Sequence, residues 1–214
     1  MLFGDDIEAI LFDMDGVLWA SSVAHGAAYN AVFAVAGLLP VDYSGLAGRR
    51  TEDVFRSSLA TDATNETIEA LTIAKQTIAR VLLRAFPPIV PGCFDVLSTL
   101  AASGRRLALV TSASAGTVRL FLDASGTATL FEVIISGHDV ALAKPAPDIY
   151  KLALGKMCAR PKQAAVVEDS PAGIEAARAA DVAVVVGIEG TTSPSLLREK
   201  GANFVVSSLR ELVN

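Results

Sequence analysis

The sequence has little cysteine, no excess of positive charge and no long apolar run. Its two cysteines, Cys93 and Cys158, are too few for a disulfide scaffold in 214 residues and too far apart for a CxxC unit. We therefore expect a protein of the reducing cytoplasm. Lys and Arg total 18 against 23 Asp and Glu, for a net charge of −5. Because phosphate backbones require a basic surface, this balance predicts that nucleic acid is not a partner.

No segment resembles a membrane helix or a secretion signal. The longest aliphatic stretch, VAVVVGI at residues 182–188, is far shorter than the roughly 20 residues that a membrane helix requires. The amino-terminal stretch MLFGDDIEAI is acidic where a signal peptide has a basic region followed by apolar residues. We therefore expect neither a membrane partner nor secretion by that route.

Signatures of several common enzyme classes are also missing. The sequence contains no GxxxxGK phosphate loop, no HExxH pair and no GxSxG nucleophile turn. It has two histidines, His25 and His138, which is fewer than a three-histidine zinc site needs. These absences argue against P-loop nucleotide chemistry, zinc hydrolysis and serine hydrolysis.

Apolar material is plentiful and follows an alternating pattern. Apolar residues make up 52% of the chain and charged residues 19%, which suits one large domain or a domain with an insertion. Short β-branched runs predict buried strands at residues 7–12, 107–110, 133–135, 165–167, 182–188 and 204–206. Helical patterns lie between them. Together these patterns predict an α/β fold, a Rossmann-like parallel sheet with helices on both faces and functional residues at the strands' carboxyl ends.

The segment from residue 19 to residue 88 interrupts this alternation. It contains no convincing strand, and its apolar residues recur at helical spacing. Three prolines then mark a link back to the sheet, namely Pro87, Pro88 and Pro91. We therefore expect a helical domain at 19–88, inserted into a core domain formed by 1–18 and 89–214. The core resumes with a helix at 92–104, whose spacing predicts a buried face of Phe94, Leu97, Leu100 and Ala101.

The first expected strand runs into two carboxylates, in the stretch ILFDMDGVL. Asp13 and Asp15 are two positions apart, so both lie on the same face of an extended chain, and Gly16 permits a sharp turn directly after them. Two aspartates at a strand end can also serve only to cap loop amides, which is the commoner arrangement for an isolated DxD.

Three further stretches place polar residues at strand ends or helix starts. Thr111 and Ser112 follow one expected strand, Lys144 lies in the stretch AKPAPD, and the pair Glu168 and Asp169 follows another strand. Taken singly, these residues are typical of a helix cap, a solvent-facing lysine and a helix start. Together they are expected at one edge of one sheet.

Four stretches, DMDGVL, VTS, AKPAPDIY and VVEDSPAGI, resemble in this order the four motifs of the haloacid dehalogenase superfamily. The match spans nearly the whole chain. The helical insertion resembles the small four-helix cap that this superfamily carries between its first and second motifs. The stretch VEDSPAGI is similar to the branch that contains phosphoglycolate phosphatases and β-phosphoglucomutase. The resemblance implies a Rossmann-like core with a small helical-bundle cap domain.

The resemblance also implies a Mg²⁺ site. Asp13, Glu168 and Asp169 form an oxygen-rich set of the kind that Mg²⁺ prefers, and the superfamily adds the backbone carbonyl of Asp15. Neighbours on an extended strand point in opposite directions. We therefore expect Asp169 to be a direct ligand, and Glu168 to bind directly or through water.

A covalent route for phosphate-ester hydrolysis follows from the same resemblance. Asp13 would attack phosphorus to form an aspartyl-phosphate, and Asp15 would protonate the leaving oxygen and then activate water. Lys144 would place a positive charge on the phosphoryl oxygens, and Thr111 would supply a directional hydrogen bond. These four residues are the expected catalytic set.

The residues expected to bind the substrate are Gly16, His25, Arg49 and Ser112. His25 lies twelve positions after Asp13, from where related enzymes reach back toward the site, and Arg49 lies in AGRRTEDVF, which resembles a substrate-contacting cap loop. A partly buried helix residue and a solvated helix start are the alternative interpretations of these two. Trp19 and Ala20 stand where many relatives have an acidic residue followed by Ser or Thr, so known substrate preferences do not transfer directly.

The expected function is a Mg²⁺-dependent phosphatase that acts on a small phosphorylated metabolite, of the sugar phosphate or phosphoglycolate type. One alternative is a phosphomutase resembling β-phosphoglucomutase. Another is a non-catalytic binding protein on the same scaffold, because fold does not fix function. We expect a monomer or a weak dimer.

Overall fold

The computed structural model describes residues 2–213 and has a six-stranded parallel sheet at its centre. The strands are β1 (Ala9–Phe12), β2 (Arg106–Val110), β3 (Val133–Ile135), β4 (Ala164–Glu168), β5 (Val184–Ile188) and β6 (Phe204–Val206). Their order is β3-β2-β1-β4-β5-β6, so β1 lies in the middle of the sheet. Phe12 of β1 lies beside Leu109 of β2 and Val167 of β4. The predicted α/β fold is confirmed, and the strand ends differ from the predicted ones by at most two residues.

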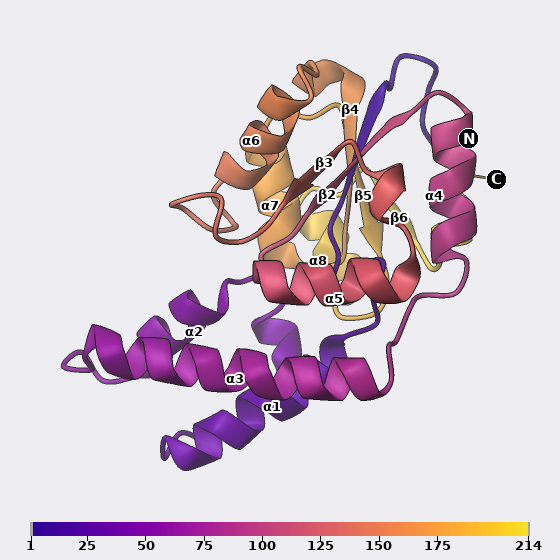
Figure 1. The fold of residues 1–214 in the computed structure, drawn as a ribbon. Coiled ribbons are helices and arrows are strands. Elements are labelled where there is room, and N and C mark those ends of the chain that lie inside the picture. The colour runs from indigo at the N-terminus through magenta and orange to yellow at the C-terminus, as the bar shows by residue number, and fades with distance from the viewer. Residues whose placement is uncertain (1, 214) are drawn as a thin grey trace.

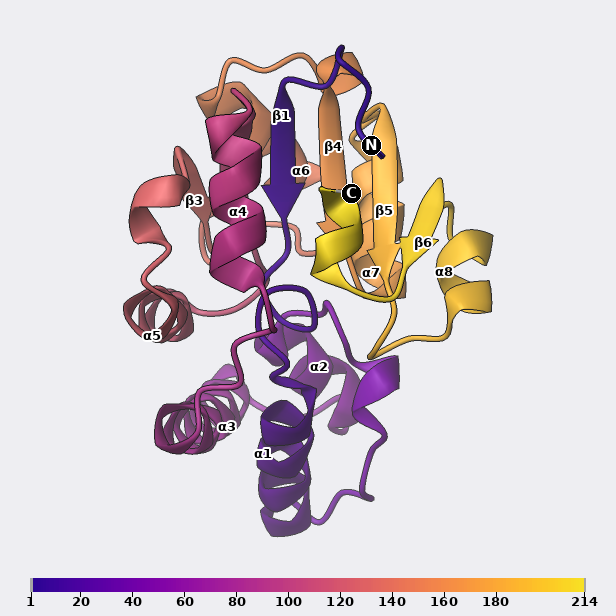
Figure 2. The ribbon, with the colours of Figure 1, turned by 90° about the vertical axis from the view of Figure 1, so that its right-hand side faces the viewer.

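Helices cover both faces of the sheet because successive strand residues point to opposite sides. The core helices are α4 (Cys93–Ala102), α5 (Ala115–Ser125), η2 (Ala128–Leu130), α6 (Asp148–Lys156), η3 (Pro161–Gln163), α7 (Pro171–Ala179), α8 (Pro194–Glu199) and η4 (Leu209–Leu212). On one face, Ile10 and Phe12 pack in one apolar cluster with α4, α5 and η4. On the other, Ala9 and Leu11 pack with α6, α7 and α8. Figure 2 shows α4 in front of the sheet and α6 and α7 behind it.

The remaining helices lie together beyond the carboxyl ends of the strands (Figures 1 and 2). They are α1 (Ser22–Val35), η1 (Tyr43–Gly45), α2 (Thr51–Ser58) and α3 (Asn65–Ala85), and we call them the cap. The cap has an apolar cluster of its own around Tyr29, Phe33, Phe55 and Ile68. The Phe33 and Phe55 rings lie 5.6 Å apart. The division into a core domain of 1–18 and 89–214 and a cap domain of 19–88 stays a prediction.

Two chain segments connect the cap to the core, and they lie side by side. The amide of Ala20 donates to the carbonyl of Pro88 (2.8 Å), and the amide of Val90 donates to the carbonyl of Leu18 (3.1 Å). Trp19, between them, is fully buried and packs on Phe121 of α5 with ring centres 5.6 Å apart. The one tryptophan of the chain is thus packed at the connection between cap and core.

The core helices are amphipathic, and one predicted helix face needs a correction. In α4, Leu97 and Leu100 are buried as predicted, but Phe94 is 52% exposed. Cys93 and Val96 complete the buried stripe instead, because the 100° step of the helix places them in line with Leu97 and Leu100. Within residues 2–213, no helix combines the length and the apolar character needed to cross a bilayer.

Candidate active site

Three residues of the expected catalytic and metal-binding sets lie at the carboxyl ends of the central strands. Asp13 directly follows β1, Thr111 directly follows β2, and Glu168 is the last residue of β4. Backbone hydrogen bonds continue the sheet to this edge, from Asp13 N to Val167 O (3.0 Å) and from Thr111 N to Ile135 O (3.0 Å). All three side chains are buried, so the sheet fixes where each functional group lies.

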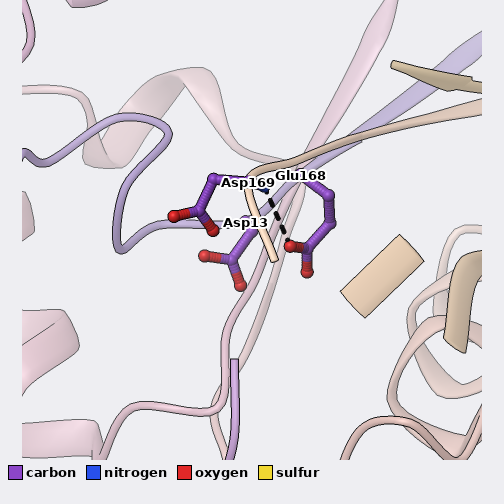
Figure 3. A group of neighbouring side chains, drawn as sticks. All are labelled: Asp13, Glu168 and Asp169. Carbon is purple, nitrogen blue, oxygen red and sulfur yellow. Dashed lines mark hydrogen bonds between the residues drawn. The ribbon is translucent and has the colours of Figure 1, made fainter. Parts of the chain in front are cut away.

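Three carboxylates form a buried cluster at this edge (Figure 3). Asp13, Glu168 and Asp169 each offer an oxygen, and these oxygens lie within 4.8 Å of one another. Burial, followed by repulsion from Glu168, raises the pKa of Asp169 to about 8. Burial also raises the pKa of Asp13, although Lys144 opposes the rise. Negative charge therefore exceeds positive charge in the cluster, and a divalent cation with oxygen ligands, such as Mg²⁺, fits these donors.

The turn after Asp15 passes close to this cluster because residue 16 is glycine. Gly16 has a φ of +82°, and a Cβ built on it would overlap Oδ2 of Asp169. Its amide donates to the carbonyl of Trp19 (2.7 Å) and so closes the turn. The structure therefore gives Gly16 a role in close backbone approach, and its contact with substrate stays a prediction.

Lys144 connects the nucleophile candidate to the acidic pair. Its Nζ donates to Oδ1 of Asp13 (2.5 Å) and to Oε1 of Glu168 (2.6 Å), and its side chain has no exposed surface. Burial alone would lower the pKa of this ammonium, but Asp13 and Glu168 raise it well above its ordinary value. Lys144 thus carries a fixed positive charge directly beside Asp13.

Glu168 is held entirely by protein donors. Its Oε1 accepts hydrogen bonds from Lys144 and from the hydroxyl of Tyr150 (2.8 Å). Its Oε2 accepts from the amides of Asp169 and Ser170 (both 3.1 Å) and from the Ser170 hydroxyl (2.9 Å). With both oxygens engaged, Glu168 acts in this arrangement as the counter-ion of Lys144 and as the anchor of the loop that carries Asp169.

The cap holds the second aspartate of the first motif. Oδ1 of Asp15 accepts a hydrogen bond from Ser21 Oγ (2.5 Å) and lies 3.0 Å from Nε2 of His25. Nζ of Lys75, on α3, lies 3.0 Å from Nδ1 of the same ring and 4.2 Å from the centre of the Tyr29 ring. A buried chain of polar contacts therefore runs from Asp15 in the core to α3 in the cap.

Charge determines the protonation states along this chain. A lysine ammonium only donates, so Nδ1 of His25 accepts and Nε2–H donates to Asp15. Burial and the charge of Lys75 lower the pKa of His25, which keeps the ring neutral. Burial alone would raise the pKa of Asp15, but His25, Ser21 and Lys75 together lower it. Burial lowers the pKa of Lys75 to about 8. At neutral pH the arrangement thus holds an ionised Asp15.

A pocket between the cap and the core opens onto both aspartates. The core contributes Thr111 and Ser112 to its lining, and the cap contributes Tyr43, Arg49 and Lys75. The guanidinium of Arg49 donates to the hydroxyl of Ser57 (3.0 Å), which holds it on the pocket wall. The walls combine hydroxyls with two cationic groups, a composition that suits a polar, negatively charged molecule.

The loop before α2 joins the cap to the core beside this pocket. The hydroxyl of Ser112 donates to the carbonyl of Gly48 (2.7 Å). Arg50 donates to the carbonyls of Val140 (2.9 Å) and Ala141 (3.2 Å), in the loop that leads to Lys144. The cap therefore rests on two of the core loops that carry predicted site residues.

The predicted site residues all lie around this pocket or in the carboxylate cluster next to it: Asp13, Asp15, Gly16, His25, Arg49, Thr111, Ser112, Lys144, Glu168 and Asp169. Their individual roles stay predictions. Sequence reasoning missed Lys75 and Tyr43. Lys75 did leave a signal, because it is a charged residue on the stripe of α3 that buries Ile68, Ala79 and Leu83. Nothing in the spacing around Tyr43 marks it as a pocket residue.

Comparison with known proteins agrees with this geometry. Residues 10–186 match the family model described as haloacid dehalogenase-like hydrolase. The chain is 34% identical over 197 residues to Protein CbbY of Rhodobacter capsulatus, which covers 85% of each chain. It is 30% identical to β-phosphoglucomutase of Mycobacterium tuberculosis, and this match covers 98% of this chain and 92% of that one. It is also 30% identical to phosphoglycolate phosphatase of Rhodospirillum rubrum, over 84% of this chain and 78% of that one.

A solved structure gives the same picture of the fold. The crystal structure of CbbY from Rhodobacter sphaeroides in complex with phosphate superposes with a TM-score of 0.81 at 31% identity, over 97% of this chain and 96% of that one. The two proteins therefore share their fold along nearly the full length of both chains. The chain belongs to the haloacid dehalogenase-like hydrolase family, in the branch of the phosphoglycolate phosphatases and β-phosphoglucomutases that its motifs resemble.

Proposed function

We propose that this phosphoric monoester hydrolase is a Mg²⁺-dependent phosphatase, which hydrolyses a small phosphorylated metabolite through an aspartyl-phosphate at Asp13. One observation carries the proposal: a buried cluster of carboxylates in contact with Lys144, next to a cap-covered pocket that Asp13 lines. A phosphate monoester is a dianion, so an anionic nucleophile reaches it only where fixed positive charge offsets the repulsion.

Asp13, Asp169 and the backbone carbonyl of Asp15 are the groups that we propose to hold the metal. Glu168 would not bind the metal directly, because both of its oxygens accept hydrogen bonds from protein donors. It would instead hold Lys144 and the loop that carries Asp169 in place. When bound, Mg²⁺ would supply positive charge to the phosphoryl oxygens and to the carboxylates. The raised pKa values of Asp13 and Asp169 support this assignment, since they reflect buried negative charge without enough compensation.

Asp13 is the proposed nucleophile. It lies at the end of the central strand and faces the pocket, and its Oδ1 is fixed by Lys144. Lys144 would remain protonated while the phosphoryl group enters, and would place its charge on the phosphoryl oxygens as Asp13 attacks. The oxygen of the Thr111 hydroxyl accepts from the amide of Ala113 (3.0 Å), which leaves the hydroxyl proton free for a phosphoryl oxygen. The new O–P bond forms as the ester O–P bond breaks.

Asp15 is the proposed acid and base. Asp15 is ionised while Ser21 and His25 contact it, so it would take up a proton when the cap opens and these contacts are lost. It would give this proton to the leaving oxygen, and the resulting carboxylate would take a proton from the water that attacks the aspartyl-phosphate. Ser21 and His25 stabilise the carboxylate form. Ser21 directly precedes α1 and His25 lies on it, so the position of the cap would control the basicity of Asp15.

The substrate is proposed to be a small sugar phosphate or a molecule of the phosphoglycolate type. The pocket supports this class because its cap side carries Arg49 and Lys75 together with the hydroxyl groups of Tyr43 and Thr51. Hydroxyl and cationic groups recognise sugar hydroxyls, carboxylates and phosphates by hydrogen bonding. We propose Ser112, His25 and Arg49 as substrate-binding residues of this pocket.

Release of inorganic phosphate from a panel of sugar phosphates, phosphoglycolate and an aryl phosphate tests the proposal. We expect turnover with Mg²⁺, none with EDTA, and a loss of at least 1,000-fold in Asp13→Asn on every ester, because the amide is not a nucleophile. Asp123→Asn, an exposed carboxylate on α5, is the control and should retain wild-type rates. Equal turnover by wild type and Asp13→Asn would contradict the proposal.

A phosphomutase is the second candidate, favoured by the similarity to a β-phosphoglucomutase over 98% of this chain. Such an enzyme would use the same Asp13 chemistry but return the phosphoryl group to a sugar hydroxyl instead of water. Incubation with β-glucose 1-phosphate and a sugar bisphosphate primer separates the two. Inorganic phosphate as the main product indicates the phosphatase, and an isomerised sugar phosphate indicates the mutase.

A further inference from the structure

Tyr150 is a fully buried polar residue of the motif AKPAPDIY to which neither the motif chemistry nor the pocket gives a role. It lies in the first turn of α6, six residues after Lys144. Its hydroxyl donates to Oε1 of Glu168 at 2.8 Å. Because the side chain has no exposed surface, water does not replace this hydrogen bond if the hydroxyl is removed.

Tyr150 and Lys144 share one carboxylate oxygen. Oε1 of Glu168 accepts from the Tyr150 hydroxyl and also from the Lys144 ammonium at 2.6 Å. The same ammonium lies 5.0 Å from the centre of the Tyr150 ring, within the range of a cation–π contact. Tyr150 is therefore linked to the Lys144 ammonium in two ways. Its ring lies against the ammonium, and its hydroxyl binds the same Glu168 oxygen as the ammonium, which in turn donates to Asp13.

We propose that Tyr150 is a positioning residue, which fixes the Lys144 ammonium beside Asp13 by holding Oε1 of Glu168. Without the hydroxyl, Oε1 keeps only Lys144 as a partner and draws the ammonium away from Asp13 and from an incoming phosphoryl group. The ring stays in place, so the packing of α6 against the sheet is unchanged. This inference rests on the proposed function, because it assumes that Lys144 contacts a phosphoryl oxygen.

Tyr150→Phe isolates the hydroxyl, and binding of inorganic phosphate with Mg²⁺ present, measured by calorimetry, is the readout. We expect the Kd for phosphate to rise about 10-fold, the effect of one charge-assisted hydrogen bond on a buried group. The matched control is Thr127→Val, which removes another fully buried hydroxyl, bonded to Ser125 (2.8 Å) and belonging to neither the pocket lining nor the carboxylate cluster. It should leave the phosphate Kd unchanged, and the Tm of both variants should fall by similar amounts.

A double-mutant cycle tests the route through Glu168. In a Glu168→Gln background, Tyr150→Phe should change the phosphate Kd by less than about 2-fold, because the shared partner is already altered. A full 10-fold effect in that background, or an unchanged Kd in the single variant, would overturn the positioning role. The two proposals fail differently. Phosphate binding that depends on Tyr150, without turnover of any ester, would overturn the phosphatase function alone, whereas a wild type that binds no phosphate would overturn both.

Discussion

Single residues of the site differ in which buried charge each side chain compensates. The positive charge of Lys144 compensates the negative charges of Asp13 and Glu168, which it contacts directly. Lys75 contacts the His25 ring, and the carboxylate of Asp15 lies on the other side of that ring. The two lysines are both buried, yet burial dominates only for Lys75, whose pKa falls to about 8. The pKa of Lys144 rises, because two carboxylates contact it directly. Removal of the two lysines should therefore have opposite effects on stability.

For Lys144→Ala we expect a large loss of both rate and stability. The variant leaves Asp13 and Glu168 buried without their cation, which costs roughly 3–5 kcal/mol in the free energy of unfolding. The KM for a phosphate ester should rise and kcat should fall together. Urea unfolding and steady-state kinetics measure the two effects. Lys162→Ala is the control, because Lys162 forms an exposed pair with Asp181 and should matter little. A Lys144→Ala enzyme with wild-type kinetics would remove this residue from the site.

For Lys75→Met we expect higher stability but lower activity. The folded pKa of Lys75 lies at about 8, below its ordinary value of 10.5, so the folded protein carries the cost of a buried charge at neutral pH. That cost is fully present below pH 8 and disappears as the pH rises toward 10.5, where the lysine is neutral in both states. The gain in the free energy of unfolding, up to about 3 kcal/mol at pH 7, should shrink over this window. A gain that does not vary with pH would contradict the assigned cause.

Sequence patterns predicted the residues that lie together at the strand ends, and they missed residues that reach the pocket only through packing of the cap helices. Asp13, Lys144 and Asp169 each belong to a motif whose residue types already indicate metal and phosphate chemistry. Lys75 belongs to no motif, and it joins the site only because α3 packs against α1 and so brings Nζ to His25. A contact between residues fifty positions apart depends on the tertiary structure, which spacing along one helix does not specify.

Among the elements of the fold, we propose that the cap helices determine what the pocket accepts and that the strand ends determine the chemistry. Strand positions were predictable to within two residues because buried parallel strands form continuous β-branched runs. The buried face of α4 was predicted less well. Phe94 is large and apolar but lies beside the stripe, so residue type alone favoured it over the smaller Cys93. Cap loops carry Arg49 and Arg50, whose different partners the sequence does not distinguish.

Cap variants should separate substrate recognition from catalysis. Arg49→Ala should lower kcat/KM for sugar phosphates by 10-fold or more but leave hydrolysis of a small aryl phosphate nearly unchanged, because the aryl ester hardly uses the cap side of the pocket. His25→Ala should lower the rate on every ester, since His25 also holds Asp15. Steady-state kinetics on the same panel measure both. Equal proportional losses on all esters for Arg49→Ala would show that Arg49 has no part in recognition.

In the molecule as a whole, the cap lies over the strand ends (Figures 1 and 2). It meets the core through two connecting segments, through the loop before α2 and through the packing of α3 against α5. Trp19 lies within the connection, packed against α5. A cap that moves as a unit would admit the substrate and then exclude water from Asp13 and Asp15. In this arrangement the residues proposed for chemistry lie on both sides of the cap segment in the sequence, and His25 and Arg49, proposed for recognition, lie within it.

Metal binding should stabilise the whole fold. In the proposed site Mg²⁺ would bind only where Asp13 and Asp169 are held together, so it would favour the folded state by about 2.7 kcal/mol at 100 times its Kd. We expect the Tm to rise with added Mg²⁺ and to return to its starting value with EDTA. In Asp169→Asn the rise should be absent, whereas the Tm in EDTA should equal or exceed that of wild type, because one repelling carboxylate is gone. An equal Mg²⁺-dependent rise in this variant would place the metal elsewhere.

Trapping the covalent intermediate is the sharpest test of whether the reaction passes through an aspartyl-phosphate at Asp13. The Asp15→Asn variant, mixed with Mg²⁺ and a ³²P-labelled aryl phosphate and then quenched in acid, still forms the intermediate because this leaving group needs no proton, but it lacks the base that activates water. The account predicts about one label per chain, released by hydroxylamine and found on the peptide that contains Asp13. Label on another peptide, or none while wild type hydrolyses the same ester, would contradict an aspartyl-phosphate at Asp13.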